Sequence, residues 1–354
     1  MGIQNYSTVA GRNLIRAEMK MLKHAENIMV LNNFGTQKEQ PLNKTDTVVF
    51  RRVRPFNATI QANPASGYSE TPDITPANFV LAEGTTPTAN TISYTDVSTT
   101  LQQYGVLFKF SSKASLLYED DIPDDMAKVC GDTLAEVAEL VCYGQVRAGT
   151  SVVYANGSAR TDVNTKVSLK ALRKAARALE TNRASKVTSM IKPGPNFGTA
   201  PVEPGYVVFI HTDLSADVRD LPGFVKRVEY GSAIKPIHPR EIGACEEFRF
   251  VTSPLFTPFA DSGAAVAGTG MLSTTGATCD IYPILIMAED AWGQVSLKGH
   301  KHTGISPTII PANQKNHANP SGMFGYVGAD FWLSSVRLNE NWMIRLECCA
   351  SDLD

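Results

Sequence analysis

The sequence predicts an α+β fold in which two amphipathic helices accompany many short strands. The helices are predicted at residues 121–147 and 168–183, where apolar side chains recur every three or four positions. Strand patterns occur before, between and after these helices. A long stretch without any basic residue is the third informative feature, and it indicates a segment that extends beyond the folded body.

Residues 55–108 contain no lysine or arginine. A segment so poor in large apolar residues buries little surface by itself, so contacts with another element or another chain must offset its ordering entropy. Four internal prolines exclude a long helix and disfavour a central strand. We expect a long two-stranded excursion with an irregular tip, with a disordered linker as the alternative. The four acids of this stretch are Glu70, Asp73, Glu83 and Asp96.

The N-terminal region combines a predicted helix at 10–31 with a basic face. Residues 1–55 hold nine basic and four acidic residues, a difference of +5. The basic face is either a solvated surface or a contact for phosphate or for an acidic partner segment. Both alternatives stay open from the sequence. The candidate contact residues are Arg12, Arg16, Lys20 and Lys23.

Both long helices have recognisable starts. Five acids lie among residues 119–125, where they favour the positive end of a helix dipole, and Pro123 suits the first helical position. A metal site is the alternative for these acids, but capping explains them without further ligands. The first helix should end near 144–149. Ser168 is the predicted N-cap of the second helix.

The remaining elements follow from local patterns. Asn156-Gly157, after the apolar residues 152–154, predicts a hairpin turn. Residues 331–338 and 342–350 predict a closing hairpin whose second strand has one apolar face. We expect strands at 45–55, 104–110, 206–211, 279–288 and 292–297, a short helix at 213–220, and loops at 185–205 and 260–278.

Composition excludes several classes of protein. The net charge of −2 gives no general attraction to nucleic acid or to anionic membranes. No apolar run approaches membrane-spanning length, and the N-terminus lacks secretory and myristoylation patterns, so we expect a soluble protein made in a cytosol with no membrane partner. The six cysteines form no CxxC pair and predict reduced, mostly buried thiols rather than disulfides.

The search for catalytic chemistry finds no supporting constellation. The sequence lacks a phosphate-binding GxxxxGK[ST] loop, an HExxH pair and a GxSxG elbow. His300, His302 and His317 are the histidine candidates for a metal site, and their region is polar and loop-like. We therefore expect no catalytic residue, no cofactor and no bound metal.

Seven segments carry a resemblance to a known family. They occur in order from Leu81 to Ser351 and, together with the order of elements, resemble the major capsid proteins of tailed bacteriophages, in the family typified by podovirus N-four. The segments are LAEGTTP (81–87), YGVLFKF (104–110), DIPDDMAKV (121–129), VVFIHTDLSADVRDL (207–221), FVKRVEYGSAIKPIHPREIGACEEFRFV (224–251), CDIYPILIMAEDAWGQVSLKG (279–299) and GMFGYVGADFWLSSVRLNENWMIRLECCAS (322–351).

The resemblance implies the Hong Kong 97-like capsid fold. The closing hairpin would then complete the peripheral sheet beside the spine helix. The implied division is an N-terminal arm at 1–45, an extended loop at 46–104, a peripheral domain with the spine helix at 105–150, an axial domain at 151–300, and a return to the peripheral domain at 301–354.

The resemblance also implies a function. Copies of the chain would assemble as pentamers and hexamers into an icosahedral head around double-stranded DNA, in a virion assembled in the host cytoplasm. Implied partners are a scaffolding protein, a portal and the packaged DNA, with Arg12, Arg16, Lys20 and Lys23 as candidate lumen-facing contacts. The polar stretches 185–205 and 300–320 are either local elaborations or sites for a decoration protein, and the sequence leaves this open. The extended loop lacks the lysine with which some capsids of this fold form isopeptide bonds. The alternative is a β-rich tail fibre or adhesin, and an enzyme comes third.

Overall fold

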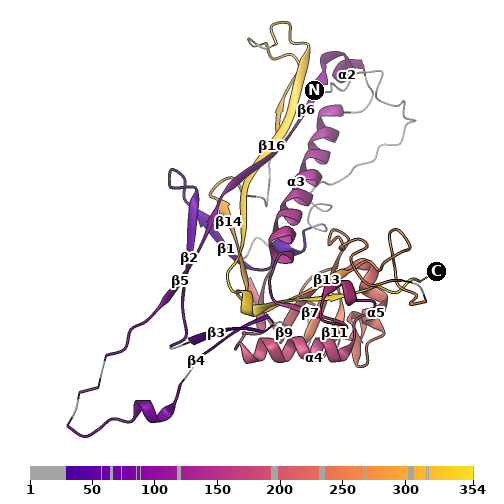
Figure 1. Cartoon of the computed structure of the whole chain (residues 1–354). Helices are drawn as coiled ribbons and strands as arrows, with labels where there is room; N and C mark the ends of the chain where they lie inside the picture. Colours follow the sequence, from indigo (N-terminus) through magenta and orange to yellow (C-terminus); the bar gives the residue numbers. More distant parts are fainter. Residues whose placement is uncertain are drawn as a thin grey trace.

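A computed structural model describes residues 29–353, with gaps at 57, 64–66, 73, 85, 88, 118–120, 193–197, 231–235, 267, 302–306, 316 and 318. Figure 1 shows an elongated body, formed by a long helix against one sheet above a second sheet, and an arm that projects from it. The helix predicted at 10–31 falls almost entirely outside the described residues. In the described part of the chain, no helix combines the length and apolarity needed to cross a membrane.

The first layer is a five-stranded sheet covered by the long helix α3 (Ile122–Arg147). Strand β6 (Gln102–Ser111) pairs with β16 along ten residues, and the short helix α2 (Ser112–Leu117) connects β6 toward α3. The other strands are β1 (Thr36–Gln40), β14 (Trp292–Leu297), β15 (Thr308–Ile310) and β16 (Phe324–Arg337).

Helix α3 begins and packs as its sequence predicts. The Asp121 carboxylate accepts a hydrogen bond from the Asp124 backbone N–H, and Pro123 stands in the first turn. Cys130 and Leu134 from the predicted stripe are buried against the sheet. The capping interpretation is therefore confirmed for Asp121, Asp124 and Asp125, whereas Glu119 and Asp120 lie outside the described residues. The helix ends at Arg147, inside the expected range.

The second sheet has eight strands, in the order β10-β11-β12-β9-β13-β17-β7, with β8 paired to β9. Helix α4 (Leu169–Thr181), capped by the Ser168 hydroxyl, covers one face together with the short helix α5 (Ser215–Arg219). Alternate residues of β9 serve the two faces: Val208 packs toward α4, and Val207 packs toward α3. The strands are β7 (Val152–Tyr154), β8 (Val187–Lys192), β9 (Gly198–His211), β10 (Phe224–Lys226), β11 (Glu241–Cys245), β12 (Phe248–Ser253), β13 (Tyr282–Met287) and β17 (Met343–Cys348).

The stretch without basic residues forms most of the arm. Strands β2 (Thr47–Val53) and β5 (Tyr94–Thr100) make an antiparallel stem, as expected for a two-stranded excursion. Beyond it, β3 (Ala58–Asn63) pairs with β4 (Gly67–Pro72), and β4 lies beside α4. The segment from 74 to 93 contains only a short 3₁₀ turn and projects away from the body in both views.

The predicted closing hairpin is wrong. Strands β16 and β17 lie in different sheets, because β16 pairs with β14 and β17 pairs with β13. The segments 282–297 and 324–348 thus run antiparallel to each other across both sheets. The predicted apolar face of the last strand is confirmed, since Ile344, Leu346 and Cys348 pack together in the core beneath α4.

Two other local predictions are wrong for related reasons. Gly157 does adopt a left-handed turn with φ of +71°, but β7 pairs in parallel with β17 instead of forming a hairpin. The Asn156 side chain bonds to the backbone of Asp162 and Asn164, which directs the chain into a loop. The expected loop at 185–205 is instead a β8–β9 hairpin. The prolines of β9 lie in the part of that strand that pairs with the edge strand β8, where proline is tolerated.

All six cysteines are buried free thiols, which confirms the prediction from their spacing. They are Cys130, Cys142, Cys245, Cys279, Cys348 and Cys349.

Candidate functional site

The candidate functional surfaces are the arm, the junction where the N-terminal segment meets α3, and a group of arginines at the foot of α3. The arm exposes large apolar side chains, of which Val80 is 78% and Leu81 is 71% solvent-accessible. Phe56 and Phe79 contact each other edge to face within it. Because these residues find no cover on their own body, the arm presents a surface suited to contact with another molecule.

The arm stem is held by its own ladder and by a charged pair. Arg51 and Asp96, on facing strands, form a two-pronged ion pair with distances of 2.7 and 2.8 Å. Both side chains are well exposed, so solvent screens this pair and its contribution to stability is small. The stem register therefore depends mainly on the β2–β5 hydrogen bonds.

Glu139 connects the N-terminal segment to α3. Its carboxylate is fully buried and accepts hydrogen bonds from the backbone N–H groups of Leu31 (2.7 Å) and Asn32 (3.3 Å). The Asn32 side-chain Nδ2 donates to the same carboxylate, and the Cys142 thiol donates to the Asn32 side-chain oxygen Oδ1. Four hydrogen bonds thus hold Leu31 and Asn32 against α3.

Burial raises the pKa of Glu139 from its ordinary value to about 7, although the hydrogen bonds from Leu31 and Asn32 oppose the rise. Nearby, burial lowers the pKa of His238, which contacts Asn33, to about 4. Glu139 therefore titrates near neutral pH rather than near the ordinary value of a glutamate.

We predict that Glu139→Gln flattens the pH dependence of stability. The folded protein binds more protons at Glu139 than the unfolded chain between pH 4.5 and 7, so this group's contribution is full below pH 4.5 and is lost as the pH rises through 7. The difference in unfolding free energy between wild type and variant should change by about 3 kcal/mol across that window. Urea unfolding at pH 4.5, 6 and 8 measures it, and a constant difference would contradict the assignment.

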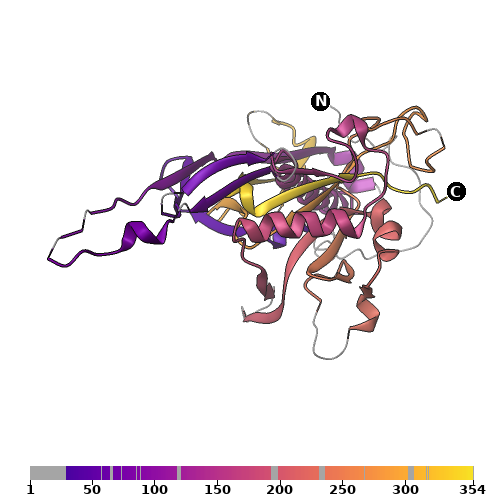
Figure 2. The same cartoon turned by 60° about the horizontal axis from the view of Figure 1, so that its bottom comes forward.

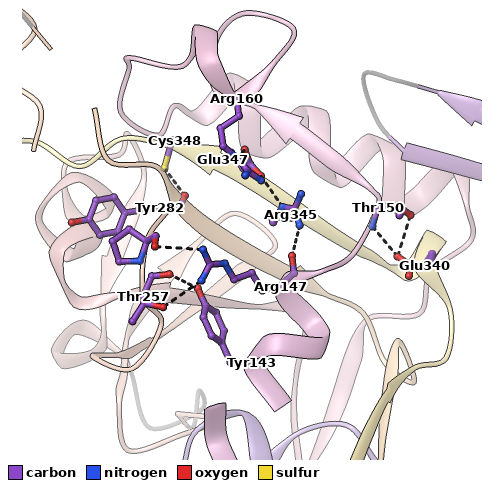
Figure 3. A network of polar contacts seen from close by, with 11 residues as sticks. Tyr143, Arg147, Thr150, Arg160, Thr257, Tyr282, Glu340, Arg345, Glu347 and Cys348 are labelled. Carbon is purple, nitrogen blue, oxygen red and sulfur yellow. Dashed lines mark hydrogen bonds and ion pairs between the residues drawn. The ribbon is translucent and has the colours of Figure 1, made fainter. Parts of the chain in front are cut away.

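The arginine cluster, defined here as Arg147, Arg160 and Arg345, lies at the foot of α3, and two of its members bind Glu347 (Figure 3). Arg160 makes a two-pronged bond to the Glu347 carboxylate at 2.7 and 2.8 Å, and Arg345 binds the same carboxylate at 2.8 Å. Arg345 also donates to the Arg147 carbonyl oxygen and so caps the end of α3. The Glu347 side chain is fully buried.

The pKa values of Arg160 and Arg345, the two arginines that bind Glu347, shift in opposite directions. The hydrogen bond from Arg160 to Glu347 raises the pKa of the Arg160 guanidinium. Burial lowers the pKa of Arg345, because desolvation outweighs its attraction to Glu347. Arginine side chains stay charged at neutral pH. The three arginines of the cluster therefore carry three positive charges beside one carboxylate.

Sequence reasoning missed both buried acids, yet each left a signal. Glu139 lies on the buried side of α3, between Ala138 and Cys142, where the helical pattern leaves it no exposed face. Arg345 and Glu347 alternate with the apolar residues of a buried strand. Charged residues at such positions require partners, and for Glu139 and Glu347 these include Leu31 and Arg160, which lie more than a hundred residues away along the chain.

The structure does not test the predicted basic contact residues. Arg12, Arg16, Lys20, Lys23 and His302 lie outside the described residues. His300 and His317 are exposed, and within the described part of the chain no three histidine, cysteine or acidic side chains are grouped to hold a metal ion. A hollow of about 350 Å³ between β6, β15 and β16 is lined mainly by apolar residues and backbone, with Asp330 as its only carboxylate.

Comparison with known proteins adds to this geometry. No protein-family model matches the chain, and no curated protein does. Solved structures do match. The capsid of Ralstonia phage GP4 has a TM-score of 0.63 at 11% identity, covering 99% of this chain and 97% of that one. The head structure of Helicobacter pylori bacteriophage KHP40 has a TM-score of 0.56 at 10% identity, covering 99% and 98%.

A third match agrees with these two. The capsid structure of cyanophage P-SCSP1u has a TM-score of 0.54 at 13% identity, covering 97% of this chain and 93% of that one. The chain therefore has the fold of phage capsid structures over nearly its whole length. This confirms the predicted Hong Kong 97-like fold class, and it gives no support to the alternative of a β-rich tail fibre.

Proposed function

We propose that this chain is a major capsid protein, which assembles as pentamers and hexamers into the icosahedral head of a tailed phage and is located in the virion. The observation that carries the proposal is the match to capsid structures over nearly the full length of both chains. The exposed arm supports it independently, because a shell subunit needs surface whose cover comes from its neighbours.

The proposed mechanism is geometric and noncatalytic. The apolar residues of the arm would be covered by an adjacent subunit, so many modest contacts would add up around a closed shell. With no lysine or arginine between residues 55 and 108, this contact would be noncovalent. The chain would act without a cofactor or catalytic residue.

We assign the two layers to the two capsid domains. The five-stranded sheet with α3 corresponds to the peripheral domain and its spine helix, and the eight-stranded sheet with α4 corresponds to the axial domain. The arm corresponds to the extended loop at 46–104. On this assignment β14 lies within 151–300 but belongs to the peripheral layer, because it pairs with β16. Strand β17 lies within 301–354 but belongs to the axial layer, because it pairs with β13. The layers therefore do not divide at residue 300.

A shell that encloses a genome needs further partners besides copies of this chain. We propose that a scaffolding protein directs curvature during assembly in the bacterial cytoplasm, that a portal occupies one vertex, that a decoration protein binds outside, and that double-stranded DNA is enclosed without sequence specificity. Electron microscopy of the chain coexpressed with its scaffold tests the proposal. Closed shells are expected, and monomers under every assembly condition would refute it.

The N-terminal basic residues give a separate prediction. Replacing Arg12, Arg16, Lys20 and Lys23 by alanine should reduce assembly or DNA retention in a salt-dependent way, because phosphate contacts release counterions. The measurement is shell yield and DNA content at low and high salt. A control variant with four exposed lysines replaced (Lys170, Lys226, Lys298, Lys315) changes the charge equally. Equal shell yield and DNA content in the two variants would show that the N-terminal basic residues make no specific contact.

A further inference from the structure

The arginine cluster has more positive charge than the described residues neutralise by direct contact. Arg160 and Arg345 share the single carboxylate of Glu347, and within the described residues Arg147 contacts no carboxylate at all. Arg147 instead donates to the Thr257 hydroxyl at 3.3 Å and to the Pro258 carbonyl at 3.4 Å. Three guanidinium groups therefore stand against one acid.

This excess charge is held in a partly desolvated place. The guanidinium carbons of Arg147 and Arg160 each lie 3.6 Å from the centre of the Phe259 ring. The ring face and the carboxyl end of α3 offset part of the charge. The remainder favours an added anion, because unpaired charge is costly where water is excluded. A planar guanidinium suits a carboxylate in particular.

The cluster is open to another molecule. The Arg160 side chain keeps 31% of its surface exposed, and the neighbouring Thr257 is exposed. Figure 3 shows Thr257 beside the Arg147 guanidinium on one side of the strand that carries Arg345, and Arg160 on the other side of that strand. A carboxylate approaching here would meet donors that Glu347 does not occupy.

The arm has the complementary charge. Residues 55–108 contain four acids and no base. Asp96 is already paired with Arg51. Glu83 belongs to the segment from 74 to 93, is exposed, and forms no ion pair with the described residues. This segment points away from the body in both views, so it extends away from the arginine cluster of its own subunit.

We propose that the arginine cluster binds the Glu83 carboxylate of a second copy of this chain. The inference rests on the proposed function, since it assigns a receiving site to the arm of a shell subunit. The contact is heterologous: a tip on one copy meets a different surface on the next, and such contacts close into rings. Charge-assisted bonds to a partly buried arginine pair would also set the register of the arm.

Charge reversal tests the contact. Glu83→Arg should lower the association constant between subunits at least about tenfold, as expected for loss of a charge-assisted hydrogen bond. Adding Arg147→Glu should restore assembly, since the pair is recreated with opposite sign. The control Glu289→Arg makes the same change of charge at another exposed acid and should assemble normally. Normal assembly of Glu83→Arg overturns the proposal.

Crosslinking gives a readout that does not depend on the stability of the Arg147 variant. The double variant Glu83→Cys/Thr257→Cys, assembled and oxidised, should give chains joined between subunits on a nonreducing gel. The six native cysteines are buried and leave little background. Glu83→Cys paired with Glu289→Cys should give none. Failure of the first pair to link, or linkage of the Thr257→Cys position to a different segment in mass spectra, overturns the proposal.

The two levels of failure are distinguishable. If the wild-type chain forms no shells, the proposed function is wrong, and the proposed contact between Glu83 and the arginine cluster is wrong with it. If shells form but Glu83→Arg assembles normally and the cysteine pair stays unlinked, the proposed function stands and the assignment of Glu83 to the arginine cluster is wrong.

Discussion

Replacing Glu347 by alanine is expected to lower the free energy of unfolding by about 3–5 kcal/mol. Glu347 is fully buried and is the carboxylate that holds both Arg160 and Arg345. Its removal leaves two guanidinium groups unpaired in a partly desolvated site. It also frees Arg345, which caps the carboxyl end of α3. Urea unfolding of the unassembled subunit measures the loss.

The matched control is Glu246→Ala. Glu246 also forms a two-pronged pair with an arginine, Arg173, but both side chains are exposed. Solvent screens such a pair, so the unfolding midpoint should stay close to that of the wild type. A loss at Glu347 no larger than the loss at Glu246 would show that burial does not make the inner pair important.

The second large effect concerns the arm. Deleting residues 55–92 and joining Arg54 to Ser93 through Asn-Gly should abolish shells while leaving a folded subunit. The Arg54 N–H bonds to the Ser93 carbonyl at 3.0 Å, so a two-residue turn can close the β2–β5 stem at this pair. The deletion removes exposed apolar side chains rather than core, apart from the β3–β4 hairpin beside α4.

Circular dichroism melting and electron microscopy separate the two outcomes. A normal melt without shells supports a role of the arm in assembly. Loss of cooperative unfolding would instead place the β3–β4 hairpin in the folding core of its own subunit. The control Val228→Ser/Leu353→Ser removes exposed apolar residues elsewhere and should assemble normally.

Elements whose cause is local could be predicted from the sequence. Helices α3 and α4 follow from apolar periodicity and from caps at Asp121 and Ser168, which lie within a few residues of what they stabilise. The arm follows from composition, because a segment with few large apolar residues cannot bury itself. The fold class was predicted from the resemblance, and the solved capsid structures confirm it.

Strand partners required the tertiary structure. The last two strands look like a hairpin because three residues separate their predicted spans, yet each pairs with a strand of the 282–297 segment. Alternation in one strand reports which face is buried but not which strand lies beside it. The β8–β9 hairpin was missed for the converse reason, because its glycines and prolines suggested a loop.

The sequence by itself thus determined the two helices, the buried faces of the strands and an arm that cannot cover its own apolar surface. Only the tertiary structure decided which strands pair and how the inner charges are neutralised. Glu139 bonds to residues 107 and 108 positions away, and Glu347 to an arginine 187 positions away. The physical reason is range: helix periodicity and capping act over a few residues, whereas sheet pairing and buried charge depend on neighbours that folding alone brings together.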